Sequence, residues 1–359
     1  MQIALTQLSI LKRGLLQVNL TKKLAPRSGT SERKFKFPHS TGLFCALLLV
    51  MLVFSVLSHG LFLYVDNLLG LLRYASSLAI LGLGLTVVLI VGEIDLSFGS
   101  LYGFCTTAFA VAFLAWNWPM WLALVFAYGL AIFWGAFNAF FTTFVKIPSF
   151  IATLGSSTFI FGFTLLIGNS NTFATAAPPV GSHTSKDSIS FFRGISNQDL
   201  PAGLPVQAIW MVVVMVIFWV VLSRSIYGFR IKAIGGNKVA AELAKLPVKR
   251  YKFFAYILCA MAAATAGILD FSFIGTIQPN AGQTFLFPVF AAVVIGGASL
   301  QGGIGNVTGT ILGALILSVI SNGLSLLASG AFAQQIFLGT VTIGAVVIDV
   351  FLRRRRARA

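Results

Sequence analysis

The chain has 359 residues, of which 57% are apolar and only 9% are charged. Soluble globular proteins have about 45–50% apolar and about 25% charged residues, so this composition excludes an ordinary soluble enzyme. Apolar stretches of about 20 residues, long enough to cross a bilayer, recur along the chain. They lack the alternation of apolar and polar positions that marks a transmembrane β-barrel. The sequence therefore predicts an all-α, polytopic membrane protein.

The apolar stretches predict ten membrane crossings. In chain order they lie at about residues 41–63, 68–91, 99–116, 119–144, 149–169, 207–223, 251–275, 285–298, 304–328 and 332–352. The polar segment before the first crossing is too long for a cleaved signal peptide. We therefore divide the chain into a basic N-terminal segment (1–40), a transmembrane domain (41–352) and an arginine-rich tail (353–359).

The net charge of +16 is concentrated outside the predicted crossings. Residues 1–40 and 224–252 each hold eight Lys or Arg against one Glu, and the tail holds five Arg. Such blocks mark cytoplasmic segments and contact anionic lipids, and this explanation is favoured over nucleic-acid binding. With ten crossings, both termini and the loop 224–250 are then cytoplasmic. The loop 170–206 is then on the opposite side of the membrane, either as an inert connector or as a contact for an external partner.

Sequence motifs for catalysis, cofactors or metals are lacking. The chain has neither a GxxxxGK[ST] phosphate loop nor a GxGxxG motif. Its three His are far apart, and its three Cys have no metal-ligand spacing. We predict that the chain is not an enzyme and binds no cofactor or metal.

Polar residues at membrane depth are candidates for the transport pathway or its gating. Asp95 follows the second crossing, where capping of the next helix is the competing explanation. Asp270 lies toward the outer half of the seventh crossing, either lining a polar path or reached by interfacial water. For Asn322 in the ninth crossing, hydrogen bonding between helices is favoured over contact with a solute.

Two glycine-punctuated segments, 91–99 and 295–303, resemble each other. Interrupted helices at corresponding places in two halves of a chain are typical of transport sites. The predicted crossings put both segments on the same side of the membrane, however, which an inverted repeat would not do.

The segment 227–248 is the most informative part of the cytoplasmic loop. Its sequence at 235–237 predicts a turn and a helix start, 240–246 predicts a short helix, and Pro247 predicts its end. A short helix held between two crossings is suited to transmit force from a cytoplasmic partner.

Four ordered passages, at 84–99, 146–155, 227–248 and 291–314, resemble the permease subunits of bacterial ABC importers for monosaccharides, of the ribose and xylose type. The resemblance implies a type II ABC importer-like permease with about ten transmembrane helices in the bacterial inner membrane. It also implies a second permease subunit of the same or a sister chain, cytoplasmic ATP-binding subunits and a periplasmic solute-binding protein. The chain would move a monosaccharide or a similar small polyhydroxylated solute.

The same resemblance implies an ATPase-coupling loop in the cytoplasm. The matching residues are Tyr227, Gly228, Gly235, Gly236, Asn237, Ala240, Ala241, Leu246 and Pro247. Among them, we expect Ala241 and Leu246 to face the ATPase. The chain departs from the family pattern at Glu93, where a Gly is usual, and at the unexpected acid Asp270. An ion-coupled secondary carrier acting without an ATPase is the alternative, and a membrane scaffold that moves nothing is a third possibility.

Overall fold

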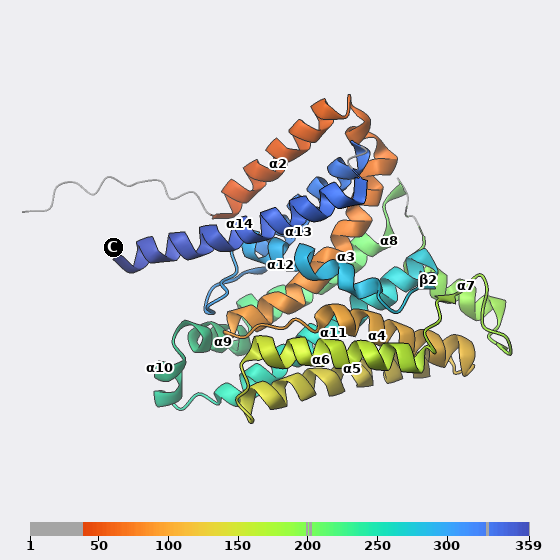
Figure 1. Cartoon of the computed structure of the whole chain (residues 1–359), viewed down its shortest axis with the longest axis horizontal. Helices are drawn as coiled ribbons and strands as arrows, with labels where there is room; N and C mark the ends of the chain where they lie inside the picture. The colour runs from red at the N-terminus through yellow and green to blue at the C-terminus, as the bar shows by residue number, and fades with distance from the viewer. Residues whose placement is uncertain (1–38, 199, 201–202, 328–329, 359) are drawn as a thin grey trace, which may run out of the picture. The chain divides into compact units, whose positions relative to one another are not determined.

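The computed structural model describes residues 39–198, 200, 203–327 and 330–358, and helices dominate this part of the chain (Figure 1). Eight of its helical segments are long and apolar enough to cross a membrane. They coincide with the first seven predicted crossings and with the ninth. The predicted crossing 285–298 is instead a helix of ten residues, too short to span a bilayer alone. The predicted number of ten crossings is therefore not confirmed.

The helices and strands have the following bounds. The long helices are α2 His39–Leu57, α3 Val65–Ile90, α5 Met120–Thr143, α6 Ser149–Ile167, α11 Val248–Ile274, α13 Val307–Leu326 and α14 Gly330–Arg358. The helices α4 Phe98–Ala110 and α8 Val206–Trp219 are each extended by a π-helical turn, Val111–Ala115 and Val220–Arg224. The shorter elements are α7 Lys186–Gly194, α9 Ile226–Gly236, α10 Lys238–Leu243, α12 Leu286–Ile295, the 3-10 helices η1 Leu61–Leu63 and η5 Ala281–Phe285, and the strands β1 Phe173–Ala174 and β2 Thr276–Ile277.

Four helices begin directly after a proline. Pro119, Pro148, Pro205 and Pro247 precede the first residues of α5, α6, α8 and α11. Proline has no backbone N–H to lose at a helix start, and it disfavours helix in the residue before it. Pro247, expected to end the short cytoplasmic helix, thus begins the next long one.

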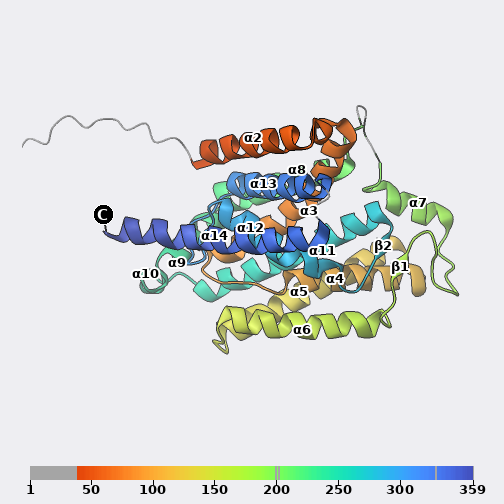
Figure 2. The ribbon, with the colours of Figure 1, turned by 45° about the horizontal axis from the view of Figure 1, so that its top comes forward.

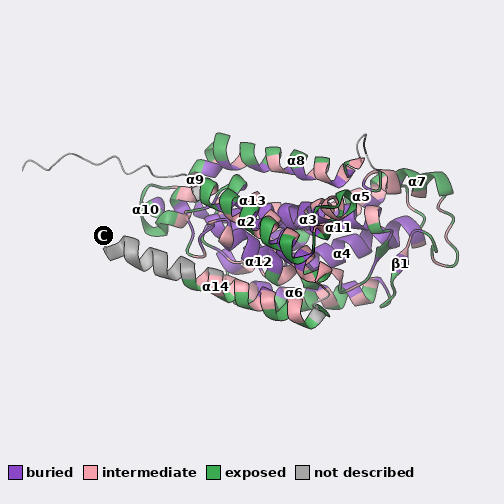
Figure 3. Ribbon diagram, turned by 90° about the horizontal axis from the view of Figure 1, so that it is seen from above, coloured by how far each residue is buried: buried purple, intermediate pink, exposed green. Residues whose placement is uncertain are grey.

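The helices α3, α4 and α11 form the buried centre (Figure 3). The helix α11 packs on α3, α4 and α5, while α13 packs on α2, α3 and α12. The helix α2 carries exposed Leu and Val side chains along most of its length. In a membrane protein, such a surface faces lipid, so α2 lies at the periphery.

Two groups of short elements lie at opposite ends of the helices (Figure 2). At one end are α9 and α10, together with the C-terminal end of α14. At the other end, β1 pairs antiparallel with β2, with Phe173 opposite Ile277. The predicted outer loop 170–206 contains β1 and the nine-residue helix α7, whose start is capped by Ser185. The basic N-terminal segment, apart from residues 39 and 40, lies outside the described residues.

Candidate functional site

The loop between α3 and α4 is non-helical and runs beside the start of α6. Ser149 Oγ accepts a hydrogen bond from the Ile94 N–H at 3.1 Å, and Thr153 Oγ1 accepts one from the Leu96 N–H at 3.0 Å. One turn further along α6, the hydroxyls of Ser157 and Ser100 are 2.8 Å apart. Since α6 begins at Ser149 and Leu96 bonds to Thr153, the loop passes about one turn into the bundle before α4 starts at Phe98. Irregular backbone at such depth is tolerated only where protein buries it or a cavity adjoins it.

The segment between α11 and α12, which contains β2 and the 3-10 helix η5, meets the start of α4 from the other end. Gly99 and Gly282 are in backbone contact, because a Cβ on Gly99 would lie 2.7 Å from the Gly282 carbonyl oxygen. A Cβ on Gly103, one turn later, would lie 3.0 Å from the Pro279 carbonyl oxygen. Two interrupted segments thus converge on the first turn of α4, an arrangement typical of membrane transport sites.

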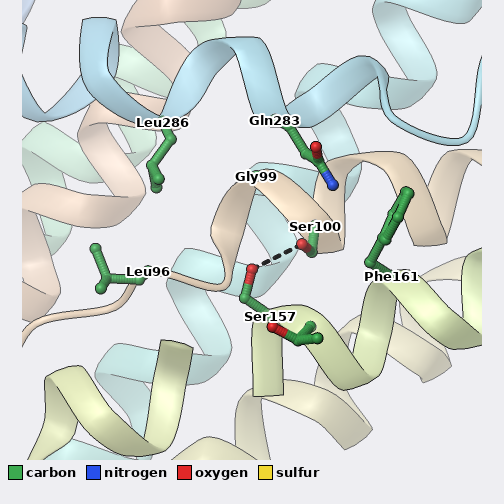
Figure 4. Close-up of a pocket in the computed structure, with 8 residues that line it drawn as sticks. Leu96, Gly99, Ser100, Ser157, Phe161, Gln283 and Leu286 are labelled. Carbon is green, nitrogen blue, oxygen red and sulfur yellow. Dashed lines mark hydrogen bonds between the residues drawn. The ribbon is translucent and has the colours of Figure 1, made fainter. Parts of the chain in front are cut away.

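A pocket of about 320 Å³ lies where these segments converge (Figure 4). Its lining residues are Leu96, Gly99, Ser100, Ser157, Thr158, Phe161, Gln283 and Leu286. Three hydroxyls and one amide therefore face a space whose other walls are apolar, with Gln283 reaching toward Ser100 and Ser157. Its volume is at the low end of the range of small-molecule sites, about 300–1,000 Å³. Its chemistry suits a small, uncharged solute with several hydroxyl groups.

A second pocket, of about 300 Å³, adjoins the first and is almost wholly apolar. Leu96 and Leu286 line both pockets, so these two side chains stand between them. The second pocket extends to Ile94 and Phe150, at the end of the molecule where α6 begins. A polar pocket is thus separated from that end by an apolar constriction.

Asp95 is fully buried in the loop before α4. Its Oδ1 accepts hydrogen bonds from the Ser97 N–H at 2.8 Å and the Ser97 hydroxyl at 2.6 Å. The Asn138 amide donates in turn to Ser97 Oγ at 2.7 Å, and the Cys259 thiol lies against the carboxyl. Burial raises the pKa of Asp95 above its ordinary value, and the Ser97 hydrogen bonds oppose this only in part. Asp95 does not line the pocket and organises the entry into α4.

Asp270 joins the four helices α3, α4, α8 and α11. Its Oδ1 accepts hydrogen bonds from Ser77 of α3 at 2.5 Å and Gln207 of α8 at 3.1 Å, and its Oδ2 accepts one from the Tyr102 hydroxyl of α4 at 2.7 Å. Asn322 forms a reciprocal amide pair with Asn67 at 2.8 and 3.0 Å. The hydrogen bonds described here for Asp95, Asp270 and Asn322 have no partner in common, and none of the three residues lines the pocket.

The segment predicted to couple to an ATPase forms two short helices, α9 and α10. Asn237 begins α10, its side-chain oxygen accepting a hydrogen bond from the Ala240 N–H at 3.0 Å. Tyr227 stacks on Tyr251 of α11 at 5.4 Å and donates to its carbonyl oxygen at 3.1 Å. Burial raises the pKa of Tyr227, so this hydroxyl stays protonated and can donate. The segment is thereby anchored to the first turn of α11.

A backbone contact links this segment to both glycine-punctuated loops. A Cβ on Gly235 would overlap the Ile90 carbonyl oxygen, and a Cβ on Gly302 would lie 2.9 Å from the Gly92 Cα. The Gly303 N–H donates to the Ile90 carbonyl at 2.8 Å. The two similar segments therefore do lie at the same end of the molecule, as the predicted crossings required. We call the set of Ile90, Gly92, Gly235, Gly302 and Gly303 the glycine junction.

The expected orientation of Ala241 is wrong. Its side chain is only 5% exposed because it packs inward, while Leu246 is half-buried against the core. The large exposed apolar side chains of α10 are Val239 at 67% and Leu243 at 81%. These two side chains, and not Ala241, form the exposed apolar face of α10.

The sequence prediction missed the polar residues that line the pocket, Ser100, Ser157, Thr158 and Gln283. One signal was present: Ser149, Thr153 and Ser157 recur every four residues and so share one face of α6. Gln283 had no comparable signal, because its position depends on where the folded chain places the short 3-10 helix η5 after α11.

Comparisons with known proteins agree with this architecture. The family described as branched-chain amino acid transport system / permease component matches residues 67–346. The ribose import permease protein of Bacillus subtilis is 35% identical over 308 residues, covering 86% of this chain and 92% of that protein.

Two proteins of Escherichia coli are also similar. A probable ABC transporter permease protein is 32% identical over 318 residues (89% of this chain, 91% of that protein). The xylose transport system permease protein is 29% identical over 390 aligned positions (92% and 99%). No solved structure matches the chain. The interrupted helices, the polar pocket between them and the extent of these matches lead to one conclusion: the chain belongs to the family of branched-chain amino acid transport system permease components, as a multi-pass transport subunit of the inner membrane and not an enzyme.

Proposed function

We propose that the chain is the transmembrane permease subunit of an ATP-binding-cassette importer for a monosaccharide or a similar polyhydroxylated solute. The observation that carries this proposal is the hydroxyl- and amide-lined pocket at the meeting point of two interrupted segments. Relatives named for ribose import and xylose transport support the solute class. A neutral sugar needs hydrogen-bond partners but no charged ligand, which fits a pocket without an ionisable side chain.

The proposed pathway passes from the polar pocket, between Leu96 and Leu286, into the apolar pocket. An apolar constriction of this kind closes a pore to water unless its walls separate. In the proposed mechanism, movement of α10 acts through the glycine junction on the loop 91–97, and that loop carries Leu96. Closure of the ATP-binding subunits can drive this step only by binding one conformation of the permease better than the other.

We propose that the chain lies in the bilayer and has three protein partners. Cytoplasmic ATP-binding subunits would contact Val239 and Leu243, and a periplasmic solute-binding protein would dock at the end that holds α7 and β1. The third partner is a second permease subunit. The second subunit would cover the pocket flank on which Thr158 and Gln283 are exposed. We also propose that both termini lie in the cytoplasm, because basic blocks flanking membrane crossings mark cytoplasmic segments.

The proposal is tested by uptake of labelled sugars into proteoliposomes. Vesicles containing this chain are compared with vesicles that also hold its co-purifying ATP-binding subunits, each with and without the binding protein. Uptake that requires ATP and both partners supports the importer. Uptake by this chain alone, driven by a proton gradient, would establish an ion-coupled carrier instead, and no flux with any partner would indicate a scaffold.

A further inference from the structure

We propose that the end of α5 and the start of α11 form a binding site for one anionic phospholipid. A pocket of about 470 Å³ lies between these helices, at the end of the molecule that holds α9 and α10. It is lined by Phe144, Lys249, Arg250, Phe253 and Phe254. The pocket shares no residue with the polar pocket described above.

Two cations face this space without an anionic partner of their own. Lys249 and Arg250 are both exposed, and neither forms an ion pair among the residues that the structure describes. The nearby Glu93 is engaged by Lys252, one turn deeper on α11. Lys249 lies over the Phe144 ring, with its Nζ 4.9 Å from the ring centroid. Such a contact holds the ammonium in place and leaves its N–H groups free for an anion.

The rest of the pocket is aromatic and continues onto the membrane-facing surface. Phe144 is 51% exposed and Phe254 is 55% exposed. Phe140, one turn deeper on α5, stacks on Phe144 with ring centroids 5.7 Å apart. A phosphate at the cations would therefore be followed, along the helices, by an apolar surface suited to acyl chains. A soluble phosphate would leave these rings unused, so the occupant is a phospholipid.

The position of the site in the fold favours lipid over a protein partner. Its cations lie on the first turn of a membrane-spanning helix, and its aromatic rings lie on the flanks of α5 and α11. The proposed contacts for ATP-binding subunits, Val239 and Leu243, lie on α10 instead. Basic pockets between helices at the cytoplasmic surface are typical binding sites for anionic head groups. The assignment of this site to the cytoplasmic leaflet rests on the proposed function, which sets the orientation of the chain in the membrane. The pocket and its lining residues do not depend on that orientation.

The test measures lipid retention by the purified full-length permease, without ATP, sugar or partner. Fluorescent phosphatidylglycerol and phosphatidylcholine are titrated into the protein in neutral detergent. The double variant Lys249→Gln/Arg250→Gln is compared with Lys238→Gln/Lys245→Gln, which removes the same charge from exposed positions of the coupling segment. We expect the first variant to bind phosphatidylglycerol about tenfold more weakly and the second to bind like the wild type.

Three further measurements test whether the bound anion is a phospholipid and whether its charge contributes to binding. Soluble glycerol 3-phosphate should not compete, because the apolar wall contributes to binding, and Phe254→Ala should weaken lipid binding. Raising the salt concentration from about 0.1 M to about 1 M should weaken wild-type binding, since the Debye length falls from about 10 Å to about 3 Å.

The proposal would be overturned if both double variants lost the same amount of phosphatidylglycerol binding. It would also be overturned if the wild-type protein bound phosphatidylglycerol and phosphatidylcholine with equal affinity. Unchanged lipid binding combined with weaker binding of the ATP-binding subunits would also overturn it, and would make the cations a protein contact. None of these binding measurements depends on transport activity. Failure of this proposal is therefore distinguishable from failure of the proposed function.

Discussion

The side chains of Glu93 and Lys252 form an ion pair in the interior of the protein, with 8% and 7% of each residue exposed. Glu93 belongs to the non-helical loop before α4, and Lys252 lies in the second turn of α11. Since α11 begins directly after the coupling segment, the pair ties the loop that lines the pocket to the element that a cytoplasmic partner would move. It lies near the glycine junction, which links the same two regions through backbone atoms.

Removing either charge of this pair should destabilise the protein strongly. A single change, Lys252→Met or Glu93→Gln, leaves the other group buried without its partner, at a cost of about 3–5 kcal/mol. The double variant Glu93→Gln/Lys252→Met removes both charges and should recover much of that loss. Thermal unfolding in detergent measures all three variants. Additive destabilisation in the double variant would contradict a direct coupling between the two side chains.

Gly235 belongs to the glycine junction and should not tolerate an added methyl group. Its sequence neighbour Gly236, which lies outside the junction, should tolerate one. A Cβ on Gly235 overlaps the Ile90 carbonyl, while a Cβ on Gly236 has open space around it. We expect Gly235→Ala to lower the stability by about 1–3 kcal/mol or to reduce transport per ATP hydrolysed. Gly236→Ala is the matched control and should behave like the wild type. Equal behaviour of the two variants would show that the close approach is not needed.

Charge on the exposed face of α10 should separate ATP hydrolysis from transport. Val239→Asp and Leu243→Asp place a carboxylate on the surface proposed for the ATP-binding subunits, without disturbing the core. We expect reduced binding of these subunits and unchanged thermal stability of the isolated permease. Ala241→Asp is the contrasting variant, since its side chain is buried and the change should lower stability. Full coupling in both exposed variants would place the docking surface elsewhere.

Helices of this protein are predictable from sequence where the signal is local. Runs of about 20 apolar residues locate eight spanning helices, and Asn237 was correctly expected at the start of a short one. The predicted crossing 285–298 failed because the 3-10 helix η5 ends at Phe285 and α12 stops at Ile295, before Gly296 and the left-handed Gly297, so only ten residues form α12. Hydropathy does not distinguish a spanning helix from a broken one.

The pocket was not predictable, for a different reason. Its polar groups come from three segments that meet only in the folded chain. The sequence instead drew attention to the ionisable side chains of Asp95 and Asp270 and to the amide of Asn322. In the structure these three bond to neighbouring helices or to their own loop. The orientation of Ala241 also failed, because which face of a six-residue helix turns inward depends on its anchoring to α11.

Asp95 gives the protein a pH dependence of known sign. Burial raises its pKa in the folded state, so the folded protein holds this proton more tightly than the unfolded chain does. Stability should therefore fall as the pH rises from the unfolded pKa through the folded one. Asp95→Asn keeps an acceptor for Ser97 and should abolish this dependence. Asp95→Ala leaves two buried donors unpaired and should lower stability by about 1–3 kcal/mol at every pH, as measured by thermal unfolding. A wild-type protein that is equally stable across the range, or most stable at high pH, would contradict the buried, protonated carboxyl.

The polar pocket should determine the apparent affinity for the sugar. Thr158→Val and Gln283→Leu each remove hydrogen-bonding groups from the pocket lining while keeping its approximate volume. A lost hydrogen bond of about 0.5–1.5 kcal/mol should raise the KM for uptake about two- to tenfold. Thr284→Val is the control, because Thr284 is adjacent to Gln283, exposed and absent from the lining. Uptake is measured in proteoliposomes with both partners present, and binding of the ATP-binding subunits is checked in parallel.

If the control raises the KM as much as the pocket variants do, the sugar does not contact this pocket. If instead kcat falls at an unchanged KM, the pocket acts in gating rather than in recognition.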